Sequence, residues 1–491
     1  MLAGRAPAIA SGFATHSSML FTEFRFAVFF AICLSVYWAL KRTSHRHAFL
    51  LVMSYIFYAG WDVRFLALIA YSTAVTYVGS RLLVTAPTPR KRRSVLVGAI
   101  TLQLASLFFF KYFDFAFDNL ATLLSAAGLA GNWSVPDILL PVGISFFTFQ
   151  AISYLVDVAR GDSPMRRAPM DVALYIAFFP QLVAGPIVRS TDFMPQLDET
   201  KHLDTDQFIR GFTVFLLGFC YKAAIADNLG LLVDPVFADP RAWTVTSIWI
   251  ATLGFHGQIY FDFAGYSWMA IGVAGMLGFA LPRNFNFPYV ARNVQEFWHR
   301  WHISLSTWLR DYVYIPLGGS RRGEARFVYA LMVTMLLGGL WHGASWNFVL
   351  WGGLHGLALL GFRYRRQIPA LGLLFRGAPT RFGSLAGLVL TQIWVFALWV
   401  PFRAESFDDT ITIFMAMFGQ LAPGENALPV WMLGVVVLPV IVDGLIGPRA
   451  EAWRARLTVS GFAYGAIMGA VFALILVLVP LSSEPFIYFR F

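Results

Sequence analysis

The sequence predicts an all-α protein that crosses a membrane many times. Of its 491 residues, 58% are hydrophobic and only 13% are charged, whereas a soluble domain carries about 25% charged residues. Apolar stretches recur along the whole chain, and about a dozen of them approach the roughly 20 residues that a helix needs to cross a bilayer. We therefore expect one transmembrane domain over residues 19–491, with some helices re-entrant or interfacial.

Residues 1–18 differ from the rest of the chain. They are weakly polar and lack the basic start, the apolar stretch and the small-residue cleavage site of a secretory signal. Met19 stands directly before the first apolar stretch. We expect a disordered tail or a misassigned start codon.

Hydrophobic runs separated by short polar loops define the predicted helices. They cover residues 24–40, 48–58, 65–84, 95–110, 139–158, 208–226, 248–261, 269–281, 327–341, 346–362, 385–400, 428–442 and 461–479. One further apolar stretch, residues 173–186, is interrupted by Pro180, Gly185 and Pro186. Because hydrocarbon cannot satisfy the backbone groups freed at such a break, we expect a re-entrant segment that lines a cavity.

The net charge of +10 does not favour a nucleic-acid partner, because the basic residues fall in short loops between the predicted spans. The positive-inside rule explains this distribution and predicts that the loops are cytoplasmic. They are residues 41–46, 89–93, 165–167 and 449–456. Both termini are then expected on the extracytoplasmic side. Cys33 and Cys220 lie in apolar runs, where small buried side chains are more typical than a disulfide.

Residues 296–312 are polar and aromatic, unlike the runs on either side. Apolar side chains at positions 297, 301, 305, 308 and 312 have helical spacing. The tryptophans suit the level of the lipid headgroups. This pattern predicts one amphipathic helix at the cytoplasmic interface.

Two histidines are the candidates for chemistry. His342 is set in an otherwise apolar run, and an ionisable group kept at membrane depth usually serves chemistry or transport. His302, beside the aromatic stripe, is its expected companion. In a low-dielectric site a neutral imidazole can act as a general base. A structural histidine, bonded to a backbone carbonyl between helices, is the alternative.

Other site types find little support. His299, His302, His342 and His355 could suggest a metal, but no cysteine pair, His-Glu-x-x-His motif or carboxylate set completes a ligand shell. No Gly-x-Ser-x-Gly nucleophile elbow is present. We expect no bound metal or cofactor.

Polar residues in other apolar runs have two interpretations each. Asp262 could orient a histidine or be a buried carboxylate at a helix end. Asn347 could position an acyl carbonyl or bridge two helices. Lys222 and Asp227 are a candidate ion pair.

Five motifs stand out: residues 292–306 (RNVQEFWHRWHISLS), 308–319 (WLRDYVYIPLGG), 338–348 (GGLWHGASWNF), 179–187 (FPQLVAGPI) and 485–489 (PFIYF). They resemble motifs of the membrane-bound O-acyltransferase family, in the branch of the bacterial alginate O-acetyltransferases. The similarity runs from Met19 to Phe491. One departure is Trp268, where relatives commonly carry an acidic residue, so the acceptor or partner could differ.

The resemblance implies a ring of helices around a thinned central tunnel, with the two histidines near its waist and His342 catalytic. It implies transfer of an acetyl group from cytosolic acetyl-CoA to hydroxyls of an extracytoplasmic polysaccharide, at the bacterial inner membrane. The acceptor would be the sugar itself or a serine on a periplasmic partner protein. His302 and Asn347 would position the thioester or stabilise its oxyanion. Candidate substrate-binding residues also include Trp298, Trp341 and, for the phosphates, Arg321 and Arg322.

Three alternatives remain at this point. One is transfer of D-alanyl or other acyl groups to a cell-wall polymer. Another is a proton-coupled transporter or glycan-export component, in which the two histidines relay protons. The third is a non-catalytic scaffold of an exopolysaccharide complex. The polymer could be alginate, cellulose, another exopolysaccharide or peptidoglycan.

Overall fold

The computed structural model describes residues 19–129, 131, 138–365, 367, 381–422, 424–456, 461–480 and 486–487. The tail expected over residues 1–18 lies outside them. Helices are the regular elements of the described residues, and the one β-type pairing among them is an isolated bridge between Trp243 and Asn426. The prediction of an all-α fold is confirmed.

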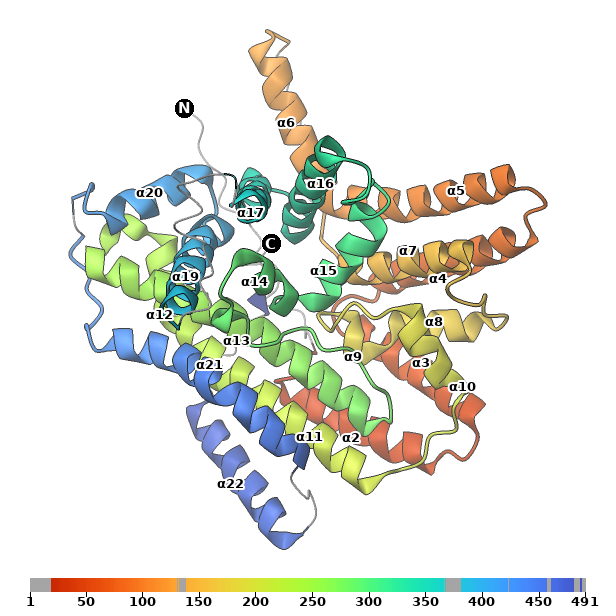
Figure 1. The fold of residues 1–491 in the computed structure, drawn as a ribbon. Helices are drawn as coiled ribbons and strands as arrows, with labels where there is room; N and C mark the ends of the chain where they lie inside the picture. The colour runs from red at the N-terminus through yellow and green to blue at the C-terminus, as the bar shows by residue number, and fades with distance from the viewer. Residues whose placement is uncertain are drawn as a thin grey trace. The chain divides into compact units, whose positions relative to one another are not determined.

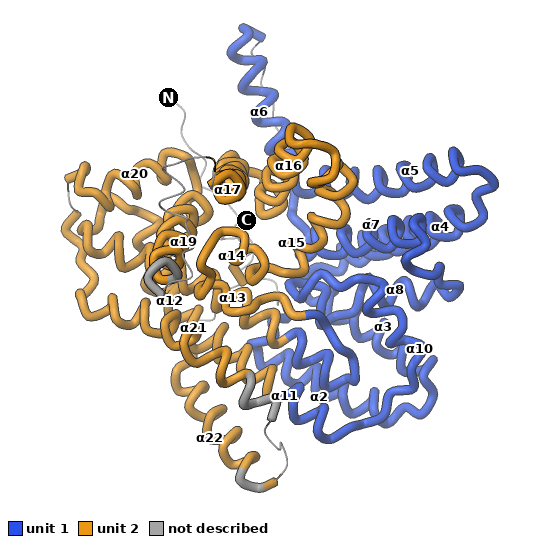
Figure 2. The backbone as a smooth tube through the Cα atoms, in the orientation of Figure 1, with its two compact units in different colours: residues 1–212, 270–282, 488–491 blue, residues 213–269, 283–487 orange. Residues whose placement is uncertain are grey.

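The chain divides into two compact units (Figure 2). Unit 1 comprises residues 1–212, 270–282 and 488–491. Its helices, labelled in Figure 1, are α2 (Phe24–Ala39), α3 (Thr43–Ala59), α4 (Phe65–Thr85), α5 (Pro89–Leu107), α6 (Phe113–Ala126), α7 (Ile144–Arg160), α8 (Pro169–Ala177), α9 (Phe179–Leu182), α10 (Ser190–Asp198) and the first half of α11 (Thr205–Phe219).

Unit 2 comprises residues 213–269 and 283–487 and contains the predicted site residues. Its helices are α12 (Asp227–Ala238), α13 (Val245–Met276, whose last residues belong to unit 1), α14 (Val294–Arg300), α15 (Ile303–Leu309), α16 (Glu324–His342), α17 (Trp346–Tyr364), α19 (Arg381–Arg403), α20 (Phe407–Met417), α21 (Met432–Arg456) and α22 (Phe462–Leu478). No element was predicted for the residues of α6, α10, α12 and α20.

Six helical stretches among the described residues are long and apolar enough to cross a membrane. They are Phe65–Thr85, Pro89–Ala126, Thr205–Ala238, Glu324–His342, Leu385–Arg403 and Met432–Glu451. Many large apolar side chains on them are exposed, as at Val78, Leu337 and Leu438. Such surfaces suit lipid rather than water, and the protein is a multi-pass membrane protein.

Two predicted helix boundaries are wrong. The spans expected at residues 248–261 and 269–281 form one continuous helix, α13. Its polar interruption does not end the helix, because Asp262 and Ser267 are both buried and have partners in unit 2. Residues 449–456, expected as a loop, are the last two turns of α21.

The amphipathic segment is also broken where one helix was predicted. Helix α14 ends before Trp301, and α15 begins after His302, whose φ of 42° is left-handed. Two backbone hydrogen bonds replace the lost helical ones: Asn286 N–H donates to the carbonyl of Arg300 (2.9 Å), and Ile303 N–H donates to that of Asn284 (2.8 Å). Periodicity could not reveal this break, because the partners lie some 15 to 20 residues away.

The proline-rich stretch of unit 1 is surrounded by protein. Helix α9 is fully buried, and the Phe179 ring packs on Phe29 and Phe57 at centroid distances of 5.4 and 5.5 Å. The Phe179 N–H donates to the hydroxyl of Ser54 (3.1 Å). Packed side chains and a side-chain acceptor thus replace the water that this broken backbone would otherwise need.

A buried ionic cluster joins three parts of unit 2. The Lys222 ammonium lies 2.7 Å from a carboxylate oxygen of Asp227 and 2.6 Å from one of Asp262. The second oxygen of Asp262 accepts the backbone N–H of Ile487 (2.7 Å). The sequence-predicted pair of Lys222 and Asp227 is confirmed, and Asp262 is a third member.

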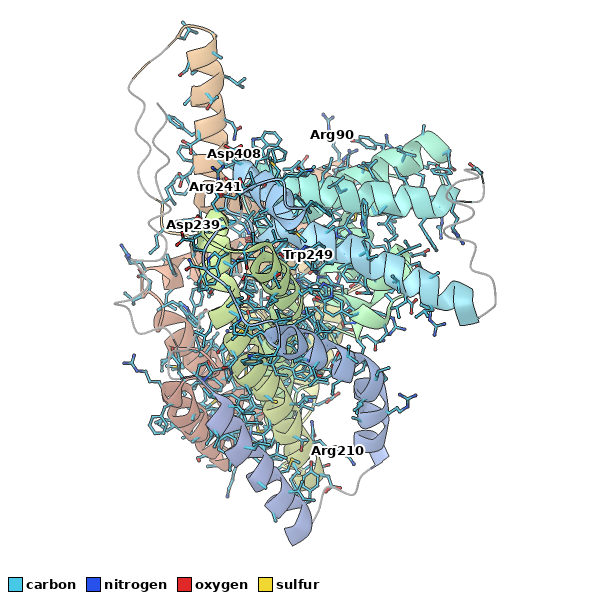
Figure 3. All side chains as sticks on the ribbon, turned by 90° about the vertical axis from the view of Figure 1, so that its left-hand side faces the viewer. Arg90, Arg210, Asp239, Arg241, Trp249 and Asp408 are labelled. Atoms are coloured by element: carbon cyan, nitrogen blue, oxygen red, sulfur yellow. The ribbon has the colours of Figure 1, made fainter. Side chains whose placement is uncertain are left out.

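Helix α13 also packs against α19 and α20. Trp249, labelled in Figure 3, stacks on Phe396 of α19 with ring centroids 5.8 Å apart. Its indole N–H donates to the carbonyl of Met417 at the end of α20 (2.9 Å). This ties α19 and α20 to the central helix of the unit.

Helices α16 and α17 lie side by side (Figure 1). Their contacts run antiparallel and meet at Gly339 and Gly352. A methyl group on Gly339 would overlap the carbonyl oxygen of Phe348, and one on Gly352 would overlap that of Met335. The two backbones are therefore in direct contact. Only residues without a side chain permit this approach.

Substituting Gly339→Ala should separate the pair and cost about 1–3 kcal/mol of stability, as overpacking does. The thermal unfolding midpoint of the detergent-purified protein should fall. Gly353→Ala is the control, because its added methyl would be in ordinary van der Waals contact, 3.4 Å from Leu336. Equal midpoints for the two variants would contradict direct backbone contact.

Substituting Lys222→Met should leave two buried carboxylates uncompensated and cost about 3–5 kcal/mol. Neutralising all three members, with Asp227→Asn and Asp262→Asn added, should recover most of the loss. Arg64→Met, which removes the pair of the exposed Arg64 with Asp62 at the surface, should change little. The same unfolding midpoints test this, and a Lys222→Met protein as stable as wild type would refute the cluster's role.

Candidate functional site

His342 is the last residue of α16, and aromatic rings enclose it. Its ring centroid lies 5.0 Å from those of Trp341, Trp351 and Phe402, each in an edge-on arrangement. The side chain is only 3% exposed. The helix ends at this position because Gly343 adopts an extended conformation, which directs the chain into α17.

His342 also lines an elongated cavity of about 730 Å³. One face of α16 forms its wall, since the lining residues recur every three or four positions: Phe327, Leu331, Thr334, Met335, Gly338 and His342. From Phe327 to His342 this face extends about 22 Å at 1.5 Å per residue. The cavity is thus long and narrow, with His342 at one end.

The other end of the cavity is cationic. Arg363, beside Glu324 and Phe327 at the start of α16, lines it together with Arg365, Ser320 and Tyr314, and Arg310 is a further cationic residue of the cavity wall. Arg310 pairs with Asp311 and Arg363 pairs with Glu324, while Arg365 donates to the carbonyl of Phe362 (2.5 Å).

Arg321 and Arg322 are exposed on the turn that follows Ser320. They are not among the residues that line the cavity. The structure therefore places the two predicted arginines beside the cationic end, and other arginines within it.

His302 is completely buried and is not among the cavity-lining residues. Its ring lies edge-on to Phe263 at 4.6 Å and to Trp341 at 5.3 Å. The Trp341 ring contacts both histidines. Burial lowers the pKa of His302 to about 3, so the ring is neutral at physiological pH.

The remaining predicted site residues occupy different places. Trp298 lines the cavity and packs edge-on against Trp351 at 5.7 Å. Trp341 forms the partition between the histidines. Asn347 is buried in the first turn of α17 and donates to the carbonyl of Ala404 (3.0 Å), so it bridges α17 and the end of α19.

Asp262 does not orient either histidine, because its carboxylate is occupied by Lys222 and by the N–H of Ile487. Among the described residues, no group of three or more histidine, cysteine or acidic side chains is placed to hold a metal ion. The four histidines that could suggest a metal, His299, His302, His342 and His355, do not converge on one point. His299 lines the cavity, whereas His355 packs among Trp298, Trp351 and Phe297.

Some members of the site were not predicted. Phe402 and Trp351 enclose His342, and Arg363 in the last turn of α17 and Arg365 directly after it lie at the cationic end. The two arginines were visible in the sequence as a basic end to a predicted span, but that pattern does not distinguish a topology signal from a binding site. Nothing in the sequence marks Phe402 among the many aromatic residues.

This geometry suits an extended, anionic molecule whose reactive end meets His342. Guanidinium groups, which are suited to phosphates, line one end of the cavity, and apolar side chains with a few hydroxyls line its length. At the other end a histidine is held away from bulk water, where proton transfer is effective.

Comparisons with known proteins agree with this chemistry. The model of the membrane-bound O-acyltransferase family matches residues 167–375, which include both histidines and the cavity. The protein of Pseudomonas aeruginosa named "Probable alginate O-acetylase AlgI" is 40% identical over 86% of this chain and 80% of its own length. Its namesake in Pseudomonas putida is 39% identical over 94% of this chain and 98% of its own length.

A peptidoglycan O-acetyltransferase of Helicobacter pylori is 34% identical over 75% of this chain and 73% of its own length. The similarity to each of these enzymes extends well beyond the stretch that the family model matches. The helical membrane fold, the buried histidine and these relatives lead to one assignment: the chain belongs to the membrane-bound O-acyltransferase family and is an acyltransferase.

Proposed function

We propose that the protein transfers acetyl groups from cytosolic acetyl-CoA to hydroxyls of an extracytoplasmic polysaccharide, at the bacterial inner membrane. The observation that carries this proposal is the cavity that joins a cationic end to His342. Acetyl-CoA is an extended molecule with phosphates at one end and a thioester at the other. The two ends of the cavity match these two groups in chemistry.

The negative charge of acetyl-CoA determines how it binds in the cavity. Its phosphates bind near Arg310, Arg363 and Arg365, and Arg321 and Arg322 raise the local positive potential. Its apolar arm runs along the face of α16, past Leu331 and Met335. The thioester then lies close to His342, between Trp298 and Trp351.

His342 acts as the general base. The acceptor hydroxyl attacks the thioester carbonyl while the His342 imidazole takes its proton. The tetrahedral intermediate collapses, the carbon–sulfur bond breaks, and the thiolate of CoA regains the proton from the imidazolium. The products are free CoA and an O-acetyl ester, so no further reactant is needed.

The acceptor class follows from the relatives. Two of them are named for alginate and one for peptidoglycan, and all three names describe acetylation of a glycan. The acceptor here is a sugar hydroxyl, or the serine of a periplasmic partner that passes the group on. The donor is cytosolic and highly charged, whereas the polymer lies outside the membrane. A passage through the protein lets the acetyl group reach the polymer without the donor crossing the lipid.

Membrane orientation follows from the charge of the loops. The basic segments at residues 41–46, 89–93 and 165–167 are cytoplasmic by the positive-inside rule, and both termini are extracytoplasmic. The same rule puts the basic turn at Arg321 and Arg322, beside the cavity, on the cytoplasmic side, so the donor enters from the side on which acetyl-CoA is made. Residues 43–46 and 89–93 are the first turns of α3 and α5. Accessibility labelling of single cysteines introduced into these basic segments tests the orientation.

The variant His342→Ala should lower acetyl transfer by about 10²- to 10⁴-fold, because the general base is lost. Purified protein in liposomes, supplied with acetyl-CoA and an acceptor glycan, provides the assay through release of free CoA. The control is His202→Ala, since His202 is exposed in unit 1. Near-normal CoA release by His342→Ala would contradict the role of His342 as general base. Movement of glycan into or out of the liposomes without CoA release would favour a transporter.

The double variant Arg363→Gln, Arg365→Gln should raise the KM for acetyl-CoA at least about tenfold with a smaller effect on kcat, because hydrogen bonds to charged groups contribute about 1.5–3 kcal/mol each. Arg90→Gln, on an exposed arginine of α5 (Figure 3), is the matched control. An unchanged KM for acetyl-CoA would argue against this donor site. Activity with a D-alanyl carrier protein and none with acetyl-CoA would identify a different acyl group.

A further inference from the structure

The side chain of Asn284 lies at the centre of a buried hydrogen-bond network beside His302. Its Oδ1 accepts the backbone N–H of Ser304 (3.2 Å) and the Ser304 hydroxyl (2.9 Å). The same oxygen lies 3.1 Å from Nδ1 of His302. Its Nδ2 donates to the hydroxyl of Ser267 on α13 (3.1 Å). Asn284 itself is 1% exposed.

The network permits only one orientation of the amide. A backbone N–H can donate a hydrogen bond but cannot accept one. The atom of Asn284 that faces the N–H of Ser304 must therefore be the oxygen. Rotating the amide by 180° would place its NH₂ group against this N–H and leave both buried donors unsatisfied.

The amide orientation in turn fixes the proton on His302. Nδ1 faces an oxygen that can only accept, so Nδ1 must carry the hydrogen. Burial keeps the ring neutral, and a neutral imidazole has a single N–H. Its Nε2 then carries no hydrogen and can accept a hydrogen bond through its lone pair. This buried nitrogen has no hydrogen-bond partner among the described residues.

We propose that Asn284 is a positioning residue that holds His302 in the Nδ1–H tautomer, so that Nε2 accepts a hydrogen bond from an O–H or N–H of the acceptor molecule that neighbours the attacking hydroxyl, whose own proton goes to His342. This inference rests on the proposed function. The two histidines then have different roles. His342 lines the donor cavity, and His302, across the Trp341 ring, binds the acceptor. This role also differs from an oxyanion-stabilising role for His302, which would require an N–H at Nε2.

The backbone of Asn284 supports the same arrangement. Its carbonyl accepts the N–H of Ile303 (2.8 Å), which holds the chain at the left-handed His302. A side-chain substitution leaves this backbone bond in place. The variant Asn284→Ala therefore removes the acceptor for Nδ1 without removing the break that positions the ring.

The tautomer can be measured directly. The ¹⁵N chemical shifts of His302, in ¹⁵N-histidine-labelled protein and assigned by difference from His302→Gln, should show a protonated Nδ1 and an unprotonated Nε2. In Asn284→Ala the proton should redistribute toward Nε2. A wild-type ring protonated at Nε2 would overturn the proposal, and this readout does not depend on acetyl transfer.

Kinetics separate positioning from simple loss of stability. Asn284→Ala should lower kcat by roughly 10- to 100-fold, as loss of a residue that orients a functional histidine does, with the KM for acetyl-CoA unchanged. Asn284→Asp keeps an acceptor at Nδ1 and should restore most of kcat at alkaline pH, where the ring stays neutral. Failure of Asn284→Asp to exceed Asn284→Ala would contradict the role.

Gln103→Ala is the structural control. Gln103 is an equally buried amide in unit 1 with three hydrogen bonds to Ser72 and Thr76. Its loss should lower the unfolding midpoint without changing kcat or the His302 tautomer. If Asn284→Ala behaves in the same way as Gln103→Ala, Asn284 is merely structural. If His342→Ala retains transfer while the wild-type tautomer is as expected, the proposed function fails and the tautomer assignment stands.

Discussion

The direct backbone contact between α16 and α17 is the constraint on which the rest of the site depends. Gly339 and Gly352 bring the two helices together near the end of α16, and His342 is the last residue of that helix. One face of α16 and the far end of α17 then enclose a cavity between the histidine and the arginines. Any side chain at the crossing would move His342 relative to the cavity that it lines.

A second constraint is that the buried charges around Lys222 and the buried donors around Asn284 in unit 2 are matched to partners. Lys222 is held by two carboxylates, and one of these also accepts the N–H of Ile487. At the break between α14 and α15, backbone and side-chain groups of Asn284 satisfy Ile303, Ser304 and His302. Unpaired groups at this depth would cost several kcal/mol each. The matching allows an irregular, polar segment to lie next to the aromatic enclosure of His342.

The candidate site was predictable in part. His342 stood out because an ionisable group interrupted an apolar run, and the structure places it on the cavity. Arg321 and Arg322 were selected for their position after two glycines, yet they lie on the exposed turn while Arg310, Arg363 and Arg365 line the cavity. Asn284 gave no signal, because an isolated asparagine near the end of an apolar stretch is common in loops.

The sequence by itself determined the class of protein, the positions of most helices and the family motifs, since these depend on apolar composition and on spacing between near neighbours. Only the tertiary structure decided that α13 continues through Asp262, that the helix breaks at His302, and which atoms meet there. Each of these depends on partners far away in the chain, such as Lys222 for Asp262 and Asn284 for His302. Periodicity records which face of a helix is apolar, but it does not record which distant residue packs against that face.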